Sequence, residues 1–216
     1  MTDGDTEAVL IVDAVTETVD TADFALWPVA DLPPYQRLPL SGRMSALEVG
    51  SAMATLVDYN ADTSDGPHSA DDAHEHIRRL LETEDVIAPG GLRIRHTGSR
   101  VTVSPGCCCG LENWRDWLDM TSGDAPWFGH DPSPRVEHAG PIVRLWPDGG
   151  DASEAPAGRP IDIPLDDLPG ILHGVRERLL GFLSLTEQWA ARHVPSLAND
   201  LVAKLDHDLA ISGPLP

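Results

Sequence analysis

The stretch LRIRHTGSRVTV, residues 92–103, decides the fold of this chain. Apolar and polar residues alternate on both sides of Thr97-Gly98-Ser99, and a glycine-containing turn between two alternating segments is typical of a β-hairpin. A hairpin joins two antiparallel strands directly, whereas parallel neighbours need a long crossover connection. The stretch therefore favours a mixed or mainly antiparallel sheet.

The segments around this hairpin predict helices and further strands. Ser45 and Glu48 form a capping-box pattern, which marks the beginning of a helix. Asp166 or Asp167 followed by Pro169 marks the beginning of another. The order of elements predicts an α+β fold in which the sheet packs with about five helices. Helices are expected near 45–57, 69–81, 111–120, 166–193 and 196–209, strands at 8–15, 142–146 and 161–163, and an ordered surface loop at 126–141.

Charge divides the chain into three sections. Its 216 residues include 35 acidic and 15 basic side chains, which give a net charge of −20 at pH 7. Eight acidic residues precede the first basic one, Arg37, and nine lie between Asp58 and Asp85, whereas six acidic residues balance six arginines over 86–147. Within a single domain, 1–216, we expect an acidic N-terminal section 1–85, a neutral central module 86–147 and a C-terminal helical section 159–216.

The composition argues against several classes of partner. A strongly acidic chain is repelled by DNA, RNA and anionic membranes. No segment approaches the roughly 18 apolar residues of a membrane span, and residues 1–23 are acidic where a secretory signal is basic. We therefore expect a cytoplasmic, bacterial protein with neither a nucleic-acid nor a membrane partner. The sequence also lacks the GxGxxG, GxxxxGK[ST], GxSxG and HExxH motifs, which disfavours dinucleotide, P-loop, hydrolase and metalloprotease functions.

Three adjacent cysteines, Cys107, Cys108 and Cys109, are the most unusual local feature. In one hypothesis they are small buried residues at a sharp turn from strand to helix. In a second, Cys108 or Cys109 begins the expected helix, whose N-terminus lowers the thiol pKa, and His130 acts as a base or ligand. The third hypothesis is a zinc or copper site. Its ligands would be Cys107, Cys109, His130 and His138.

The second half of the chain resembles bacterial immunity proteins of the SUKH type over roughly residues 92–192. Five features carry the resemblance: the hairpin, a tryptophan-containing helix, a Gly/Asp/Pro loop, a strand ending in Trp-Pro-Asp, and a helix after IPLDDL. They lie at 92–103, 114–118, 129–134, 142–148 and 163–168. The cysteine triplet and the long N-terminal section depart from the family pattern. The resemblance implies a non-catalytic protein, without a cofactor, that binds and neutralises a toxin, often a nuclease.

Charge and resemblance together predict an acidic immunity protein that binds a basic toxin domain. Complementary charge speeds such an association, and exposed tryptophans often anchor it. The alternative is a thiol-dependent enzyme, or a metal or redox sensor, that uses the run Cys107 to Cys109, with Cys108, Cys109 and His130 as its catalytic groups. The residues expected to bind the toxin are Asp58, Asp62, Asp65, Asp71, Asp72, Glu75, Trp127 and Asp131.

Overall fold

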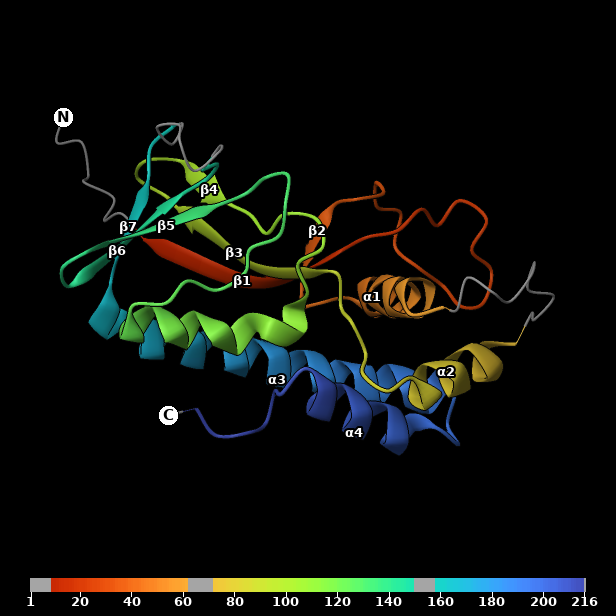
Figure 1. The fold of residues 1–216 in the computed structure, drawn as a ribbon. Helices are drawn as coiled ribbons and strands as arrows, with labels where there is room; N and C mark the ends of the chain where they lie inside the picture. The colour runs from red at the N-terminus through yellow and green to blue at the C-terminus, as the bar shows by residue number, and fades with distance from the viewer. Residues whose placement is uncertain (1–8, 62–71, 150–157, 216) are drawn as a thin grey trace, which may run out of the picture.

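Two antiparallel sheets lie over a layer of helices in the computed structural model, which describes residues 9–61, 72–149 and 158–215 (Figure 1). This arrangement confirms the expected α+β fold. The first sheet has the strand order β2-β1-β3-β4 and the second the order β5-β6-β7. The strands are β1 (Leu10–Glu17), β2 (Arg37–Pro39), β3 (Gly90–His96), β4 (Val101–Val103), β5 (Arg135–Ala139), β6 (Ile142–Trp146) and β7 (Ile161–Pro164).

The expected hairpin is the β3–β4 pair. The strand β1, from near the N-terminus, pairs with β3 in antiparallel orientation. Alternation gives this first sheet one apolar and one charged face. Val12 and Ile94 are buried on the apolar face. On the other face the Asp13 carboxylate pairs with Arg93 at 3.1 Å and with Arg95 at 2.9 Å. The charged face is therefore held by ion pairs between neighbouring strands.

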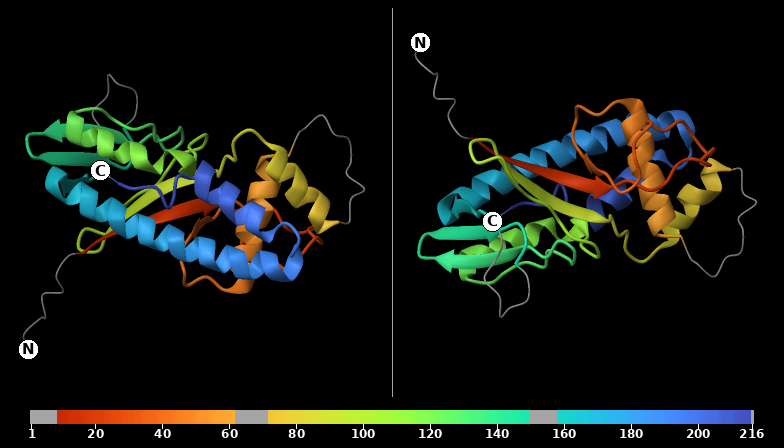
Figure 2. Two further views of the ribbon diagram at one scale, coloured as in Figure 1. Left: turned by 90° about the horizontal axis from the view of Figure 1, so that it is seen from below. Right: turned by 90° about the horizontal axis from the view of Figure 1, so that it is seen from above.

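The helices form the second layer and one end of the molecule. In Figure 1, α3 and the 3-10 helix η1 run beneath the sheets and α4 lies along α3, while Figure 2 shows α1 and α2 together at one end. The expected capping box of Ser45 and Glu48 is present at the start of α1. The helices are α1 (Ala46–Tyr59), α2 (Ala73–Glu82), η1 (Leu111–Ser122), η2 (Leu165–Asp167), α3 (Leu168–His193) and α4 (Ala198–Asp208).

The spacing of the two tryptophans on η1 follows from the geometry of a 3-10 helix. Leu111, Trp114, Trp117 and Met120 are all buried and follow one another at intervals of three. A 3-10 helix has three residues per turn, so this spacing places all four side chains on one face. They join a hydrophobic core that also includes residues of both sheets and of α3 and α4.

Two segments differ from the sequence-based expectations. The segment 126–141, expected to be a loop, contains β5, which pairs with β6 in antiparallel register. The three-residue strand β2 was not expected, because its Arg-Leu-Pro sequence has little strand character. In the described part of the chain, no helix is both long enough and apolar enough to cross a membrane.

Candidate functional site

The cysteine triplet lies on the loop between β4 and η1, and His130 lies on the loop between η1 and β5. We call residues 105–110 the cysteine loop and residues 127–131 the histidine loop. The two loops pair through their backbones: the Cys107 amide donates to the His130 carbonyl at 2.6 Å, and the His130 amide donates to the Cys107 carbonyl at 2.9 Å. This pairing brings together residues that are 23 positions apart in the sequence.

Two glycines allow the loops to approach so closely. A Cβ atom on Gly106 would lie 1.8 Å from the His130 carbonyl oxygen, and one on Gly129 would lie 2.3 Å from the Cys107 carbonyl oxygen. Gly129 also has a φ of +85°, which side-chain-bearing residues rarely adopt. Any larger residue at either position would push the loops apart.

The sheet holds the other side of the cysteine loop. The Arg37 guanidinium, on β2, donates to the Pro105 carbonyl at 3.0 Å. The Gly90 amide at the start of β3 donates to the Cys109 carbonyl at 2.9 Å. The loop is thus fixed between the sheet and the histidine loop.

Within this frame, the side chains of Cys107, Cys108 and His130 converge, and we call these residues the Cys–His cluster. Their two sulfur atoms and one ring nitrogen all lie within 4.8 Å of one another. Cys108 has a φ of +59°, a left-handed conformation. Consecutive side chains in an extended chain point to opposite sides, and the turn at Cys108 removes that opposition. All three residues are exposed.

Cys109 is not part of this cluster. Its thiol donates to the Trp127 carbonyl at 3.5 Å, and its sulfur lies 3.2 Å from where a Cβ on Gly91 would be. Burial, and the nearby Glu112 carboxylate, raise the pKa of Cys109 to about 11. Cys109 is therefore half-buried against β3 and mainly protonated at neutral pH.

The structure corrects two of the hypotheses about the cysteines. Burial of the whole triplet is wrong, since Cys107 and Cys108 are exposed. A lowered thiol pKa at a helix N-terminus is also wrong: η1 begins only at Leu111, and a hydrogen bond with the Cys107 thiol raises the pKa of Cys108. Hydrogen bonding between two thiols favours the protonated form.

The cluster has the chemistry of a metal site. Donor atoms that share one zinc or copper ion at about 2.0–2.3 Å lie about 3.5–4 Å apart, so the three atoms need to move little to meet one ion. Cysteine sulfur and imidazole nitrogen are the ligands that zinc and copper prefer. Compared with the ligand set expected from the sequence, Cys108 takes the place of Cys109. His138 lies elsewhere, with its Nε2 atom 3.3 Å from the Asp124 carbonyl.

Trp127 and Asp131 lie beside the cluster. The indole of Trp127 is 53% exposed, and its ring centroid lies 4.9 Å from that of His130, at an interplanar angle of 79°. Its Nε1 donates to the Cys108 carbonyl at 3.3 Å. Asp131, next to His130, is exposed. These two residues were expected to bind a protein partner.

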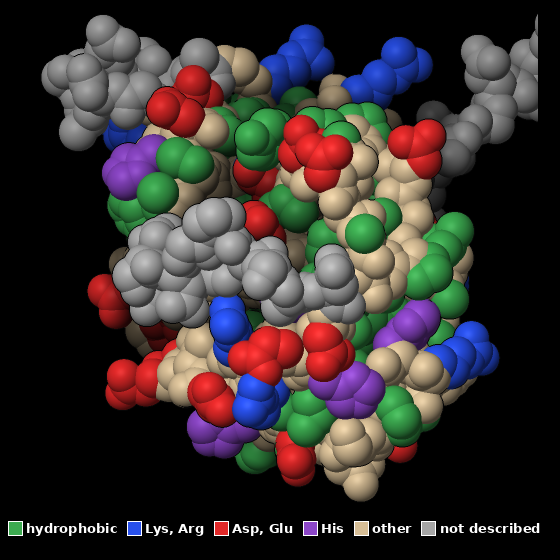
Figure 3. Space-filling view, turned by 90° about the vertical axis from the view of Figure 1, so that its right-hand side faces the viewer, with side chains coloured by type: hydrophobic (Ala, Val, Ile, Leu, Met, Phe, Trp, Pro, Cys, Tyr) green, Lys and Arg blue, Asp and Glu red, His purple; other side chains and the backbone are tan. Residues whose placement is uncertain are grey.

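The other residues expected at a partner interface belong to the α1–α2 end of the molecule. Asp58 is exposed near the end of α1, the Asp72 side chain caps α2, and Glu75 forms ion pairs with Arg78 and Arg79. Figure 3 shows this end, where acidic side chains are interspersed with arginines and histidines. Asp62, Asp65 and Asp71 lie outside the described residues.

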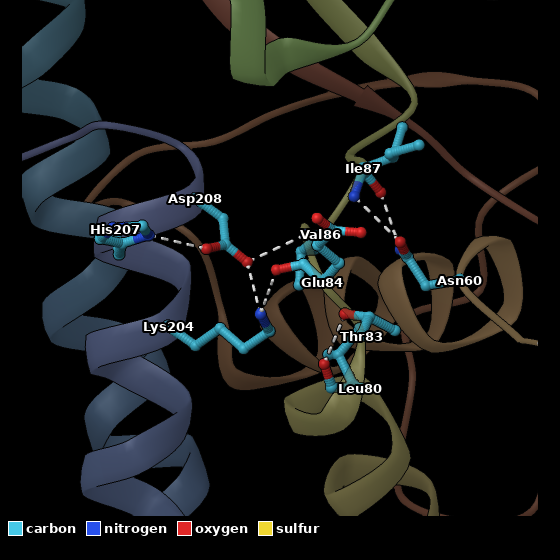
Figure 4. A network of polar contacts seen from close by, with 9 residues as sticks. All are labelled: Asn60, Leu80, Thr83, Glu84, Val86, Ile87, Lys204, His207 and Asp208. Atoms are coloured by element: carbon cyan, nitrogen blue, oxygen red, sulfur yellow. Dashed lines mark hydrogen bonds and ion pairs between the residues drawn. The ribbon is translucent and has the colours of Figure 1, made fainter.

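A second polar cluster joins α4 to the segment between α2 and β3 (Figure 4). The Asp208 carboxylate accepts hydrogen bonds from the Val86 amide at 2.9 Å and from Lys204 at 2.9 Å, and it lies 3.0 Å from the His207 ring nitrogen. Lys204 also donates to the Glu84 carbonyl at 3.2 Å. We call these residues the Asp208 cluster.

Burial alone would raise the pKa of Asp208, but its hydrogen bonds from His207, Lys204 and Val86, together with the Lys204 charge, outweigh burial and hold this pKa below its ordinary value. The folded structure therefore favours the charged carboxylate of Asp208 over its protonated form. The Asp208 cluster connects elements of the fold.

No family model, curated protein or solved structure matches this chain. The SUKH-type resemblance accordingly stays a prediction.

Proposed function

We propose that this protein binds a soft or borderline transition-metal ion at the Cys–His cluster and acts as a metal sensor. The observation that carries the proposal is the convergence of two sulfur atoms and one imidazole nitrogen within 4.8 Å on exposed loops. Zinc and copper both accept such ligands. A bound ion would link the cysteine and histidine loops, which precede and follow η1, and would so change the surface around them.

The triplet itself supplies a matched test. Reduced protein is titrated with Zn²⁺ against a chromophoric chelator, without oxygen, and compared with its Cys107→Ser, Cys108→Ser and Cys109→Ser variants. One ion per chain is expected. Loss of Cys107 or Cys108, each a direct ligand, should weaken binding by about 100-fold or more, because even loss of an outer-shell partner of a metal ligand costs 10- to 100-fold. Cys109→Ser removes a neighbouring sulfur that lies outside the cluster, and it should change the affinity less than about 3-fold.

The two histidines give a second matched pair. His130→Gln should weaken binding by about 10- to 100-fold, whereas His138→Gln should leave it unchanged. Equal effects of the two substitutions, or a dependence on Cys109 as strong as that on Cys107, would show that the cluster is not the site. A Zn²⁺ affinity too weak for the chelator assay, together with no uptake of copper, would reject the proposed function.

We propose as a second function the immunity role expected from the sequence. Its support is the net charge of −20 and the exposed indole of Trp127 beside Asp131. Binding to a purified basic toxin domain is measured at increasing ionic strength, since attraction between charged surfaces weakens as salt screens it. The affinity should fall about 10-fold or more between 50 and 300 mM salt, and Trp127→Ala should weaken it further. Affinity that does not respond to salt would contradict this proposal.

A further inference from the structure

Among the described residues, the Cys–His cluster contains three ligands, two of which are sulfur, and no carboxylate. Zinc in structural sites almost always has four protein ligands in a tetrahedron, and in catalytic sites it has three plus water. Cu(I) has a filled d shell and a single charge, and it forms stable complexes with only two or three soft ligands. Thiolate ligands in particular select Cu(I). The ligand number and type therefore fit Cu(I) without any further group.

Trp127 adds a second, independent observation. The half-exposed indole of Trp127 is hydrogen-bonded to the cysteine loop, and the backbone of the same residue makes a second bond to that loop. Its Nε1 donates to the Cys108 carbonyl at 3.3 Å, and its own carbonyl accepts from the Cys109 thiol at 3.5 Å. The ring stands edge to face with the His130 ring, 4.9 Å away. The indole is thus held beside the nitrogen ligand, where it can shield a bound ion from solvent.

From these contacts we infer that the resident ion is Cu(I), three-coordinate through Cys107, Cys108 and His130, with the indole of Trp127 as its cover. The inference rests on the proposed metal-binding function and names the ion. On binding, each of the two thiols releases one proton to solvent, and the imidazole binds as the neutral ring. Copper arrives and stays as Cu(I), so no electron is transferred.

The first experiment compares the two metals directly. Reduced protein is mixed, without oxygen, with one equivalent each of Cu(I) and Zn²⁺, desalted, and analysed for metal. We expect about one copper and less than about 0.1 zinc per chain, and X-ray absorption at the copper edge should show two sulfur atoms and one nitrogen. Zinc retained in preference to copper would overturn the inference while leaving the proposed function intact. Uptake of neither metal would reject both.

One variant tests the nitrogen ligand, and another tests the covering indole. His130→Gln should remove the nitrogen from the copper spectrum, and an unchanged spectrum would overturn the three-coordinate assignment. Trp127→Phe should speed oxidation of the bound ion by air 5- to 10-fold. It should also abolish most of the fluorescence quenching by Cu(I).

Trp146→Phe is the matched control, because Trp146 is a half-buried tryptophan on β6 whose Nε1 bonds to Glu137. It should change neither the oxidation rate nor the quenching. An oxidation rate of the Trp127→Phe variant equal to that of Trp146→Phe would overturn the covering role of Trp127.

Discussion

The Cys–His cluster and the Asp208 cluster both form where segments distant in the sequence meet. They differ in the groups that surround their polar atoms. In the Asp208 cluster the carboxylate faces an amide, an ammonium group and an imidazole that all compensate its charge. In the Cys–His cluster the ligand atoms of Cys107, Cys108 and His130 face one another and the solvent. A polar group satisfied by its neighbours stabilises the fold, whereas these converging donor atoms have the arrangement that a metal ion requires.

The largest effect is expected at the contact between the two loops. Gly106→Ala would place a Cβ atom 1.8 Å from the His130 carbonyl and 2.2 Å from the Pro132 carbonyl. The loops must separate, so we expect a loss of about 3 kcal/mol in the free energy of unfolding and about 100-fold weaker metal binding. Denaturant titration and the chelator assay measure the two effects. The control is Gly170→Ala, where nothing lies within 4 Å of the added atom. Similar losses for the two variants would contradict the close approach.

A smaller loss, confined to stability, is expected for Asp208→Asn. The substitution removes a charge that Val86, Lys204 and His207 compensate, and should cost about 2 kcal/mol at neutral pH with unchanged metal affinity. Because the folded-state pKa is lowered, the stabilisation is present above the unfolded value of about 3.9 and is lost as pH falls through the folded value. The wild type and the variant should therefore differ less at pH 3 than at pH 5.

Denaturant titrations at both pH values test this expectation. Asp200→Asn, an exposed carboxylate on the same helix, serves as the control and should cost less than about 0.5 kcal/mol. A difference between wild type and Asp208→Asn that grows as the pH falls would reverse the expected sign and contradict a lowered pKa.

Asn60→Ala should have a still smaller effect. The Asn60 amide donates to the Leu56 and Ile87 carbonyls, each at 2.8 Å, and its oxygen accepts from the Ile87 amide at 2.9 Å. Figure 4 draws the two contacts with Ile87. Since the site is partly exposed, water can replace part of these bonds, and we expect a loss of about 1.5 kcal/mol. Thermal unfolding checks the value. A change in metal affinity would show that the contact between Asn60 and Ile87 is coupled to the Cys–His cluster, which their separate contacts do not lead us to expect.

The smallest effect on stability is expected from modification of the exposed thiols. Iodoacetamide should alkylate Cys107 and Cys108, which are exposed, about 10-fold faster than Cys109, which is half-buried in the folded protein. The melting temperature should hardly change. Peptide mass spectrometry with time assigns the sites, and added metal should protect the two fast cysteines. Equal rates at all three cysteines would contradict the separation of exposed Cys107 and Cys108 from half-buried Cys109.

Much of the fold could be predicted because its signals are local. The alternation of residues 92–103, the capping box at Ser45 and the proline after Asp167 each depend on neighbours within a few positions. The pairing of β1 with β3 depends on residues about 80 positions apart, and a hydrophobic pattern does not select such a partner. The three-residue repeat from Leu111 to Met120 does contain the signal of a 3-10 helix, since an α-helix would also use intervals of four.

The site could be predicted only in part. The cysteines and His130 were identifiable by residue type, but the choice of Cys108 over Cys109 depends on one left-handed backbone angle at Cys108. Nothing in a run of three identical residues shows which of them adopts it. The contact of Gly106 with the histidine loop is also non-local. A glycine on each loop, at Gly106 and Gly129, is the signal that could have suggested close pairing.

Lys204 is the one lysine of the sequence. Its side chain is 14% exposed and is engaged with Asp208 and the Glu84 carbonyl. Amine-directed acylation of this side chain therefore requires the Lys204 ammonium group first to leave its two partners at the junction between α4 and the segment that precedes β3. Its rate provides a built-in kinetic probe of local opening at that junction.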